Sequence, residues 1–197
     1  MASEKVMNEE KPEEVDHDQL FEIAMKGHWD EVVEVYKKSS KARMAKLTKS
    51  EDTALHLAVS DGLTDIVVKL VDSIPANEAS KILEIKNGGG NTPLHIAAIV
   101  GNEDMCVCIA LKQSNLIIAR NAESKTPLFL AAHLGKQGPF LCLHEVWKKE
   151  SVDYTPCRKS NGDTILHTAI DGEYFSKCCI LLQIFFFFFW WWGRPVF

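Results

Sequence analysis

The apolar positions of this 197-residue chain recur in blocks of similar length rather than in one continuous pattern. Each block holds a short apolar run, a glycine, and then an amphipathic stretch with apolar residues at helical spacing. The blocks align on leucines that lie 34 to 39 residues apart, which are Leu20, Leu55, Leu94, Leu128 and Leu166. This period predicts a solenoid of five units of about 33 to 40 residues, each of which buries its apolar face against its neighbours.

Each block predicts two helices and a polar turn. A threonine begins the first helix as its N-cap, because its hydroxyl can accept from an unpaired backbone N–H; these residues are Thr53, Thr92, Thr126 and Thr164. Pro93 and Pro127 follow where the first helical residue needs no N–H. Glycine ends this helix in the left-handed conformation, at Gly62, Gly101 and Gly135 among others. A second amphipathic helix and a polar stretch such as "NGGGN" (87–91) complete the block.

The turn position two residues before the threonine is not the same in every block. Gly90 and Gly162 occupy it in two blocks, whereas Glu51 and Ser124 occupy it in two others. Glycine alone takes all turn conformations without steric cost. We therefore expect the turns at Glu51 and Ser124 to be less ideal.

The segment "GNTPLHIAAIVGN" (90–102) resembles the ankyrin repeat almost throughout, and the resemblance recurs with the right period. It implies an all-α ankyrin-repeat solenoid of about five helix-turn-helix units joined by β-turn fingers. We expect an acidic disordered tail at 1–17, an ankyrin domain at 18–183 and an aberrant aromatic tail at 184–197. The expected units are 18–48, 49–87, 88–121, 122–159 and 160–183.

A closer resemblance covers residues 18–183. "LFEIAMKGHWDEVVEVY" (20–36), "EIKNGGGNTPLHIAAIVGNEDMCVCIA" (84–110) and "NGDTILHTAIDGEYF" (161–175) are similar to the plant ankyrin membrane proteins with a C-terminal PGG domain, of the accelerated-cell-death type. The resemblance implies defence and stress signalling at the plasma membrane or an endomembrane, on the cytosolic face. We expect this chain to be truncated before the membrane domain, and on its own to be cytoplasmic or adsorbed to membranes.

One histidine stands inside the apolar run of three blocks, at His56, His95 and His167. The resemblance implies that such histidines join neighbouring loops by hydrogen bonds. Phe21 and Phe129 replace them in the other two blocks, and equivalent positions are spread along a solenoid. We therefore expect a structural ladder and no metal site, since a metal needs converging ligands.

Catalytic chemistry is not indicated. Cys142 and His144 form the best pair, but residues two apart on a helix point to different sides, and no third group orients them. The triple glycine at 88–90 lacks the lysine and spacing of a phosphate loop, so we interpret it as a flexible turn. We expect no catalytic residue, no cofactor and no enzyme, and keep a cysteine-dependent enzyme as a remote alternative.

The charge of the chain limits the classes of partner that it can bind. The net charge is −5 and no long basic block is present, which argues against nucleic acid. The N-terminus lacks the apolar region of a signal peptide, so we read the six cysteines as thiols. We expect other proteins as partners. The candidate partner-binding finger tips are Asn87, Asn91, Arg120, Asn121, Lys125, Lys159 and Asn161, although turn geometry alone also explains such residues.

The C-terminal segment departs from the repeat. Cys178–Gly193 carries no charge, but sixteen helical residues reach only ~24 Å against a hydrocarbon core of ~30 Å. The run Phe185–Trp192 could still mediate membrane association. The composition from about residue 184 onward suggests a retained intron, a shifted frame or a mispredicted gene end. The leading function is a non-enzymatic protein-protein interaction module. A soluble truncated isoform that acts as adaptor or competitor of a longer form is the alternative.

Overall fold

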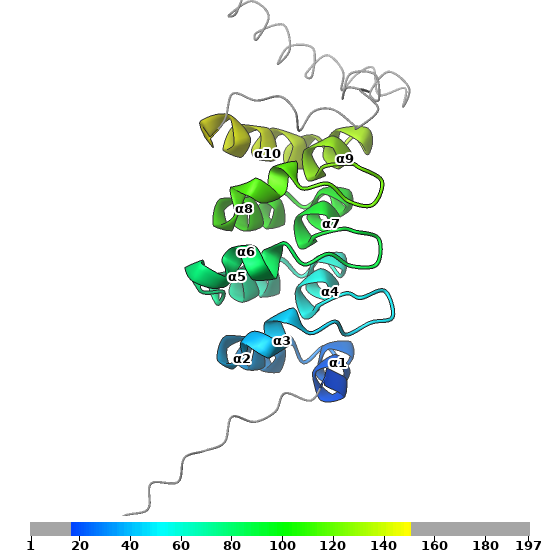
Figure 1. Ribbon diagram of the computed structural model, residues 1–197, viewed down its shortest axis with the longest axis vertical. Helices are drawn as coiled ribbons and strands as arrows, with labels where there is room; N and C mark the ends of the chain where they lie inside the picture. The colour runs from blue at the N-terminus through cyan, green and yellow to red at the C-terminus, as the bar shows by residue number, and fades with distance from the viewer. Residues whose placement is uncertain (1–16, 151–197) are drawn as a thin grey trace, which may run out of the picture.

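The computed structural model describes residues 17–150, and the regular elements in this range are all helical. Four helix pairs are stacked along the long axis of the molecule (Figure 1). From the first unit to the fourth, the pairs are α1 (His17–Met25) with α2 (Trp29–Lys38), α4 (Ala54–Ser60) with α5 (Thr64–Asp72), α7 (Pro93–Val100) with α8 (Glu103–Lys112), and α9 (Pro127–His133) with α10 (Gln137–Glu150). The expected all-α solenoid is thus confirmed for these units. The expected fifth unit, the C-terminal tail and residues 1–16 of the N-terminal tail lie outside the described residues, and His17 begins α1.

The core runs continuously through the stack. The anchoring leucines Leu20, Leu55, Leu94 and Leu128 are buried, and each contributes about 1.5–3 kcal/mol through removal of apolar surface from water. Ala58, Ala97 and Ala131 on the first helices are completely buried. Because these side chains are small, α4, α7 and α9 can pack closely against one another.

Each of the first three units contains an additional short helical segment that the sequence pattern did not indicate. These segments are α3 (Ser40–Met44), the 3-10 helix η1 (Ala76–Glu78) with α6 (Ala79–Leu83), and the 3-10 helix η2 (Ser114–Ile118). The expected polar stretch is present as a turn, but a short helical segment comes before it in each of these units. The segments form because apolar residues there reach the core, and the buried ones include Ala42, Ile82, Leu83, Leu116 and Ile117.

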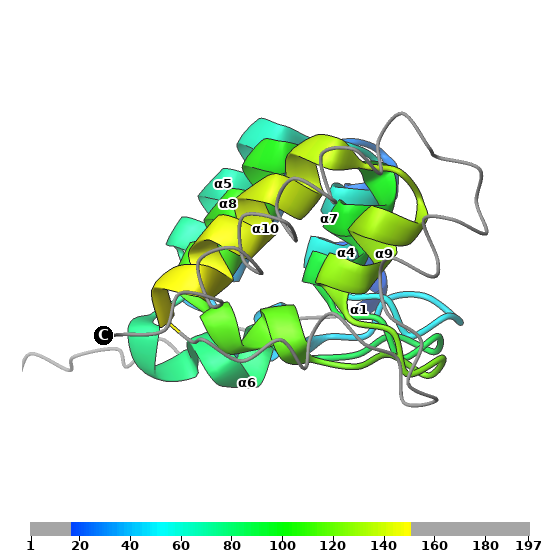
Figure 2. The same cartoon turned by 90° about the horizontal axis from the view of Figure 1, so that it is seen from above.

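Three hairpin-like turns project from the same side of the stack and lie above one another (Figure 2). We name them finger 1 (46–52), finger 2 (86–91) and finger 3 (120–125). A backbone N–H···O bond closes each finger, from Leu47 to Asp52 at 2.7 Å, from Asn87 to Asn91 at 2.9 Å, and from Asn121 to Lys125 at 3.0 Å. The only extended pairing within 17–150 is an isolated bridge between Lys46 and Thr53.

Glycine ends the first helix of every described unit. Gly101 is the C-cap of α7 with φ 89°, a left-handed conformation that side chains disfavour. Gly27, Gly62 and Gly135 hold the same place in the other units and also have positive φ. The chain therefore reverses at the same point in each unit, which keeps the second helices in register.

Candidate partner-binding surface

Buried histidines join two of the units to the finger that follows. In the second unit, Nδ1 of His56 accepts from the N–H of Thr53 at 3.3 Å and from its hydroxyl at 2.8 Å. Nε2 of His56 lies 3.0 Å from the carbonyl oxygen of Asn91 in finger 2. Because a carbonyl oxygen can only accept, the ring proton is on Nε2 and Nδ1 is bare.

The third unit repeats this arrangement one finger further along. His95 Nδ1 accepts from the N–H and hydroxyl of Thr92 at 3.1 and 2.8 Å, and Nε2–H donates to the Lys125 carbonyl in finger 3 at 3.2 Å. Burial lowers the pKa of His95 to about 4, and burial likewise lowers the pKa of His56. Both rings are therefore neutral at pH 7. No cluster of three metal-ligating side chains occurs among residues 17–150.

The fourth unit begins its first helix without a histidine. Thr126 Oγ1 accepts from the N–H of Phe129 at 3.1 Å, and Pro127 occupies the first turn of α9. Phe129 is completely buried, and its ring stacks on His133 with centroids 6.2 Å apart. An apolar ring thus fills the position that His56 and His95 occupy. Thr164 and His167 of the fifth unit lie outside the described residues.

The asparagines proposed as finger tips bond within and between the fingers. Oδ1 of Asn87 accepts from the N–H groups of Gly89 and Asn91 at 3.1 and 3.0 Å, and its Nδ2 donates to Asp52 in finger 1 at 2.8 Å. Oδ1 of Asn121 accepts from Glu123 and Lys125 at 3.0 Å each. The Asn121 Nδ2 group donates to Oδ1 of Asn91 at 2.9 Å. These amides fix the conformation of each finger and hold neighbouring fingers against one another.

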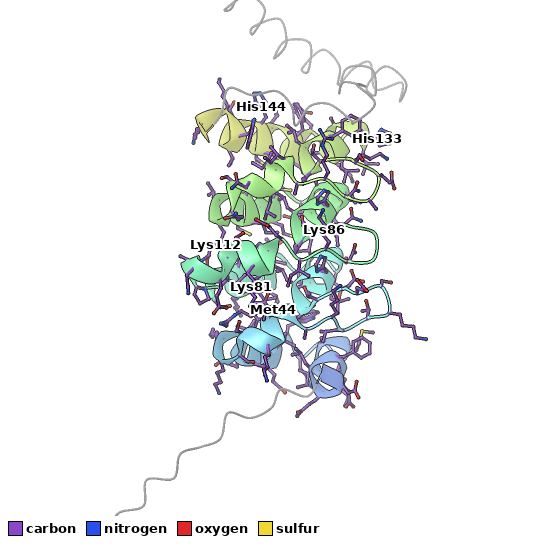
Figure 3. The ribbon with its side chains drawn as sticks, in the orientation of Figure 1. Met44, Lys81, Lys86, Lys112, His133 and His144 are labelled. Atoms are coloured by element: carbon purple, nitrogen blue, oxygen red, sulfur yellow. The ribbon has the colours of Figure 1, made fainter. Side chains whose placement is uncertain are left out.

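The charged finger residues also make local contacts. Lys86 lies beside the fingers (Figure 3), and its Nζ donates to the Arg120 carbonyl at 2.7 Å. Nη1 of Arg120 donates to the Ser124 carbonyl at 2.7 Å, and Lys125 pairs with Glu123 at 2.6 Å. Lys159 and Asn161 lie outside the described residues. The described tip residues therefore serve finger geometry, whatever further contacts they make.

The triple glycine is packed between its neighbours. The Gly88 N–H donates to the Ser50 carbonyl of finger 1 at 2.7 Å, and the Gly89 carbonyl accepts from Ala122 of finger 3 at 3.3 Å. Gly90 has φ +72°, and a Cβ placed on it would lie 2.5 Å from the backbone nitrogen of Ala122. The triple glycine is thus a hydrogen-bonded turn, and at Gly90 there is no room for a Cβ.

Glu51 and Ser124 occupy the equivalent turn position with φ 62° and 59°. They are the non-glycine residues with positive φ in the described part of the chain. Both turns therefore carry the steric cost that the sequence indicated, roughly 1–2 kcal/mol for an ordinary side chain in this region.

Exposed apolar side chains gather at the ends of two neighbouring first helices. Ile99 and Val100 end α7 and are 37% and 38% exposed, and Leu134 follows α9 and is 38% exposed. We call these three residues the apolar patch. Finger 2 leads into the start of α7 and finger 3 into the start of α9, so the apolar patch lies at the opposite ends of these helices from the fingers. Leu57 and Ile96, on the neighbouring α4 and on α7, are half-buried beside the core.

The sequence analysis missed this patch, although a signal for it exists. The positions five and six residues after the anchoring leucine read Ile99–Val100 in the third unit and His133–Leu134 in the fourth. The second unit has Ser60–Asp61 at the same place. Comparison of the repeats column by column finds an apolar residue at one or both of these positions in the third and fourth units and, as Met25, in the first, but polar residues in the second.

Cys142 and His144 both lie on α10, and their contacts lead in different directions. The Cys142 thiol donates to the Pro139 carbonyl at 3.2 Å and faces α8. The His144 ring stacks on Phe140 with centroids 6.1 Å apart, and burial lowers its pKa.

Comparison with known proteins identifies the type of repeat in this chain. Residues 20–110 match the family model described as ankyrin repeats (3 copies). The fold is an ankyrin-repeat solenoid. Over 71 residues, 36% of this chain, the sequence is also 35% identical to an ankyrin repeat-containing protein of Arabidopsis thaliana. That match covers 13% of the relative's length, so the chain corresponds to a small part of it.

The ankyrin-repeat fold is a non-enzymatic fold that typically serves protein-protein interaction. Its rigid stack presents an extended surface built from first helices and fingers. Among residues 17–150, the structure contains no helix with the length and apolar character that a bilayer crossing requires. The run Phe185–Trp192 lies outside the described residues.

Proposed function

We propose that this chain is a protein-protein interaction module that binds its partner mainly through the apolar patch. The observation that carries this proposal is the exposure of Ile99, Val100 and Leu134 at equivalent places in adjacent units. Burial of such side chains against a partner removes apolar surface from water, which is the main driving force of association. Scattered surface leucines need no explanation, but a contiguous group on a rigid face indicates a contact site.

The fingers lie at the other ends of α7 and α9 and are not the centre of this surface. Their asparagines already satisfy one another, so a partner gains little from amides whose bonds it would have to break. Exposed charges such as Lys49 and Glu123 can orient a partner, since rim charges act mainly on association rate and specificity.

The patch can be tested by charge substitution. A tagged full chain carrying Ile99→Glu and Leu134→Glu is expressed in plant cells, and the captured proteins are quantified against the unsubstituted chain. Leu111→Glu is the matched control, because Leu111 is 68% exposed on α8, in the second-helix layer. Figure 3 shows the neighbouring Lys112 on the side away from the fingers. We expect the control to retain the captured set and the double variant to lose it. Retention by both variants would contradict the proposal.

We further propose that the module acts in membrane-associated defence or stress signalling. The support is the resemblance of segments such as 84–110 to the plant PGG-domain proteins, together with the match to an Arabidopsis thaliana protein. An antibody raised against residues 17–150 is used to blot soluble and membrane fractions of the source tissue, before and after a stress treatment. We expect the product in the membrane fraction, and a product found only in the soluble fraction under every condition would exclude this role.

A further inference from the structure

Two cysteines from adjacent units meet between the second helices. Cys106 on α8 is completely buried, and Cys142 on α10 is half-buried. The two thiol groups are close enough to shift each other's pKa, which is lowered for Cys142 and raised for Cys106. The Cys142 sulfur also lies 4.0 Å from the carbonyl oxygen of Glu103, one helical turn before Cys106. Cys142 thus reaches α8 one helical turn from Cys106, at the interface between the third and fourth units.

The two thiols differ in reactivity. Cys142 can be reached from solvent, whereas Cys106 lies within the apolar core. The Cys106 thiol, as a donor group beside Cys142, stabilises a Cys142 thiolate and so lowers the pKa of Cys142. The same contact, together with burial, raises the pKa of Cys106. Cys142 is therefore the attacking thiol and Cys106 the thiol placed to react second.

We propose that hydrogen peroxide oxidises Cys142 and Cys106 to a reversible disulfide that links α8 to α10. The Cys142 thiolate attacks one peroxide oxygen, the O–O bond breaks, and a sulfenic acid forms while hydroxide leaves and takes up a proton as water. The Cys106 thiol loses its proton and attacks the Cys142 sulfur, the S–O bond breaks, and a second water leaves. The two sulfurs together lose two electrons, and one peroxide becomes two waters.

This disulfide would connect the two units that carry the apolar patch. α8 packs on α7, which ends in Ile99 and Val100, and α10 packs on α9, which Leu134 follows. A covalent link between α8 and α10 fixes the spacing of these units. The inference does not depend on the proposed partner-binding function, because it concerns the thiols alone.

Cys108 provides a matched control on the same helix. It is half-buried, its thiol donates to the Met105 carbonyl at 3.3 Å, and burial raises its pKa to about 11. Residues two apart on a helix do not face the same neighbour, so Cys108 is not placed to react with Cys142.

The experiment maps the disulfide in the full chain. The reduced protein is treated with hydrogen peroxide, free thiols are alkylated, and tryptic peptides are analysed by mass spectrometry. We expect peptide 87–112 linked to peptide 137–148 in the unsubstituted chain, at least tenfold above the untreated sample and removed by dithiothreitol. The Cys108→Ser variant should keep the link, which assigns it to Cys106, and the Cys142→Ser variant should lose it.

Three outcomes would overturn the proposal: Cys142 oxidised to sulfinic acid without a linked peptide, a link from Cys142 to any other cysteine, or a link only between two chains. Cys142 is half-buried and serine is nearly isosteric with cysteine, so circular dichroism should show Cys142→Ser to be folded. The result is decided by the Cys108→Ser and Cys142→Ser variants, so no substitution of the buried Cys106 is needed.

Discussion

A single histidine in each of two units satisfies several polar groups that would otherwise be buried without partners. His95 accepts hydrogen bonds from the N–H and hydroxyl of Thr92, and its own ring N–H donates to the Lys125 carbonyl. Thr92 and His95 are both completely buried, so water cannot replace these bonds without opening the structure. The histidine therefore begins its own helix and fastens the next finger at the same time.

Replacement of His95 by alanine should lower the free energy of unfolding by ~1–3 kcal/mol at pH 7, since buried groups lose their partners. Urea titration followed by circular dichroism measures the change. His28→Ala is the control, because the His28 side chain is 57% exposed and makes only a surface contact with Glu31. The control should stay within ~0.5 kcal/mol of the parent. An equally stable His95→Ala protein would contradict the structural role.

The same buried ring predicts a pH dependence. The pKa of His95 is about 4 in the folded protein against an ordinary value of 6.5, so the unfolded chain binds more protons between these values. The contribution of His95 to the free energy of unfolding is fully present above pH 6.5 and is lost as the pH falls towards 4. It amounts to about 3 kcal/mol. His56 adds a change in the same direction, because its pKa is also lowered.

Unfolding free energies at pH 7, 5.5 and 4 test this dependence. Carboxyl groups also titrate in this range, so the informative quantity is the slope of the parent minus that of His95→Ala. We expect the parent to lose stability more steeply than the variant. Equal slopes would mean that His95 titrates alike in the folded and unfolded states.

At the level of elements, the parts that the sequence predicts are those whose causes lie within a few residues. Thr92 at the start of α7 and Gly101 at its end act on the backbone beside them. Because equivalent residues recur in the other units, the sequence alone predicts where these helices begin and end. The short helix α6 has no comparable threonine at its start or glycine at its end. It forms because Ile82 and Leu83 reach a core made by residues far along the chain, so a five-residue segment cannot reveal it.

Finger stability should depend on the turn position shared by Glu51, Gly90 and Ser124. Ser124→Gly should raise the free energy of unfolding by roughly 0.5–1 kcal/mol, because relief of the left-handed strain exceeds the entropy cost of glycine. Gly90→Ala should lower it by more than ~1 kcal/mol, because its Cβ would meet the Ala122 nitrogen at 2.5 Å. Urea titration of both variants measures the change in the free energy of unfolding. Changes of the same sign in both variants would contradict this account of the fingers.

At the scale of the four described units, the main contacts join elements of the same or consecutive units. α4 packs on α7 and α7 on α9, while α2 packs on α5, α5 on α8 and α8 on α10. The register between units decides what meets across each interface, and a repeat pattern does not encode it. Cys106 and Cys142 illustrate this, because they lie twelve and fourteen residues after their anchoring leucines and so share no column of the repeat.

A stack with neighbour-only contacts should respond locally to a local change. Hydrogen exchange of His95→Ala should show finger 3 amides such as Ala122 and Ser124 exchanging roughly tenfold faster for each ~1.4 kcal/mol lost, with α1 and α2 unchanged. His56→Ala should shift the affected region by one unit, to Asn87 and Gly90 of finger 2, because His56 holds the Asn91 carbonyl. Acceleration spread evenly over all described units in both variants would instead mean that the solenoid opens as one cooperative body.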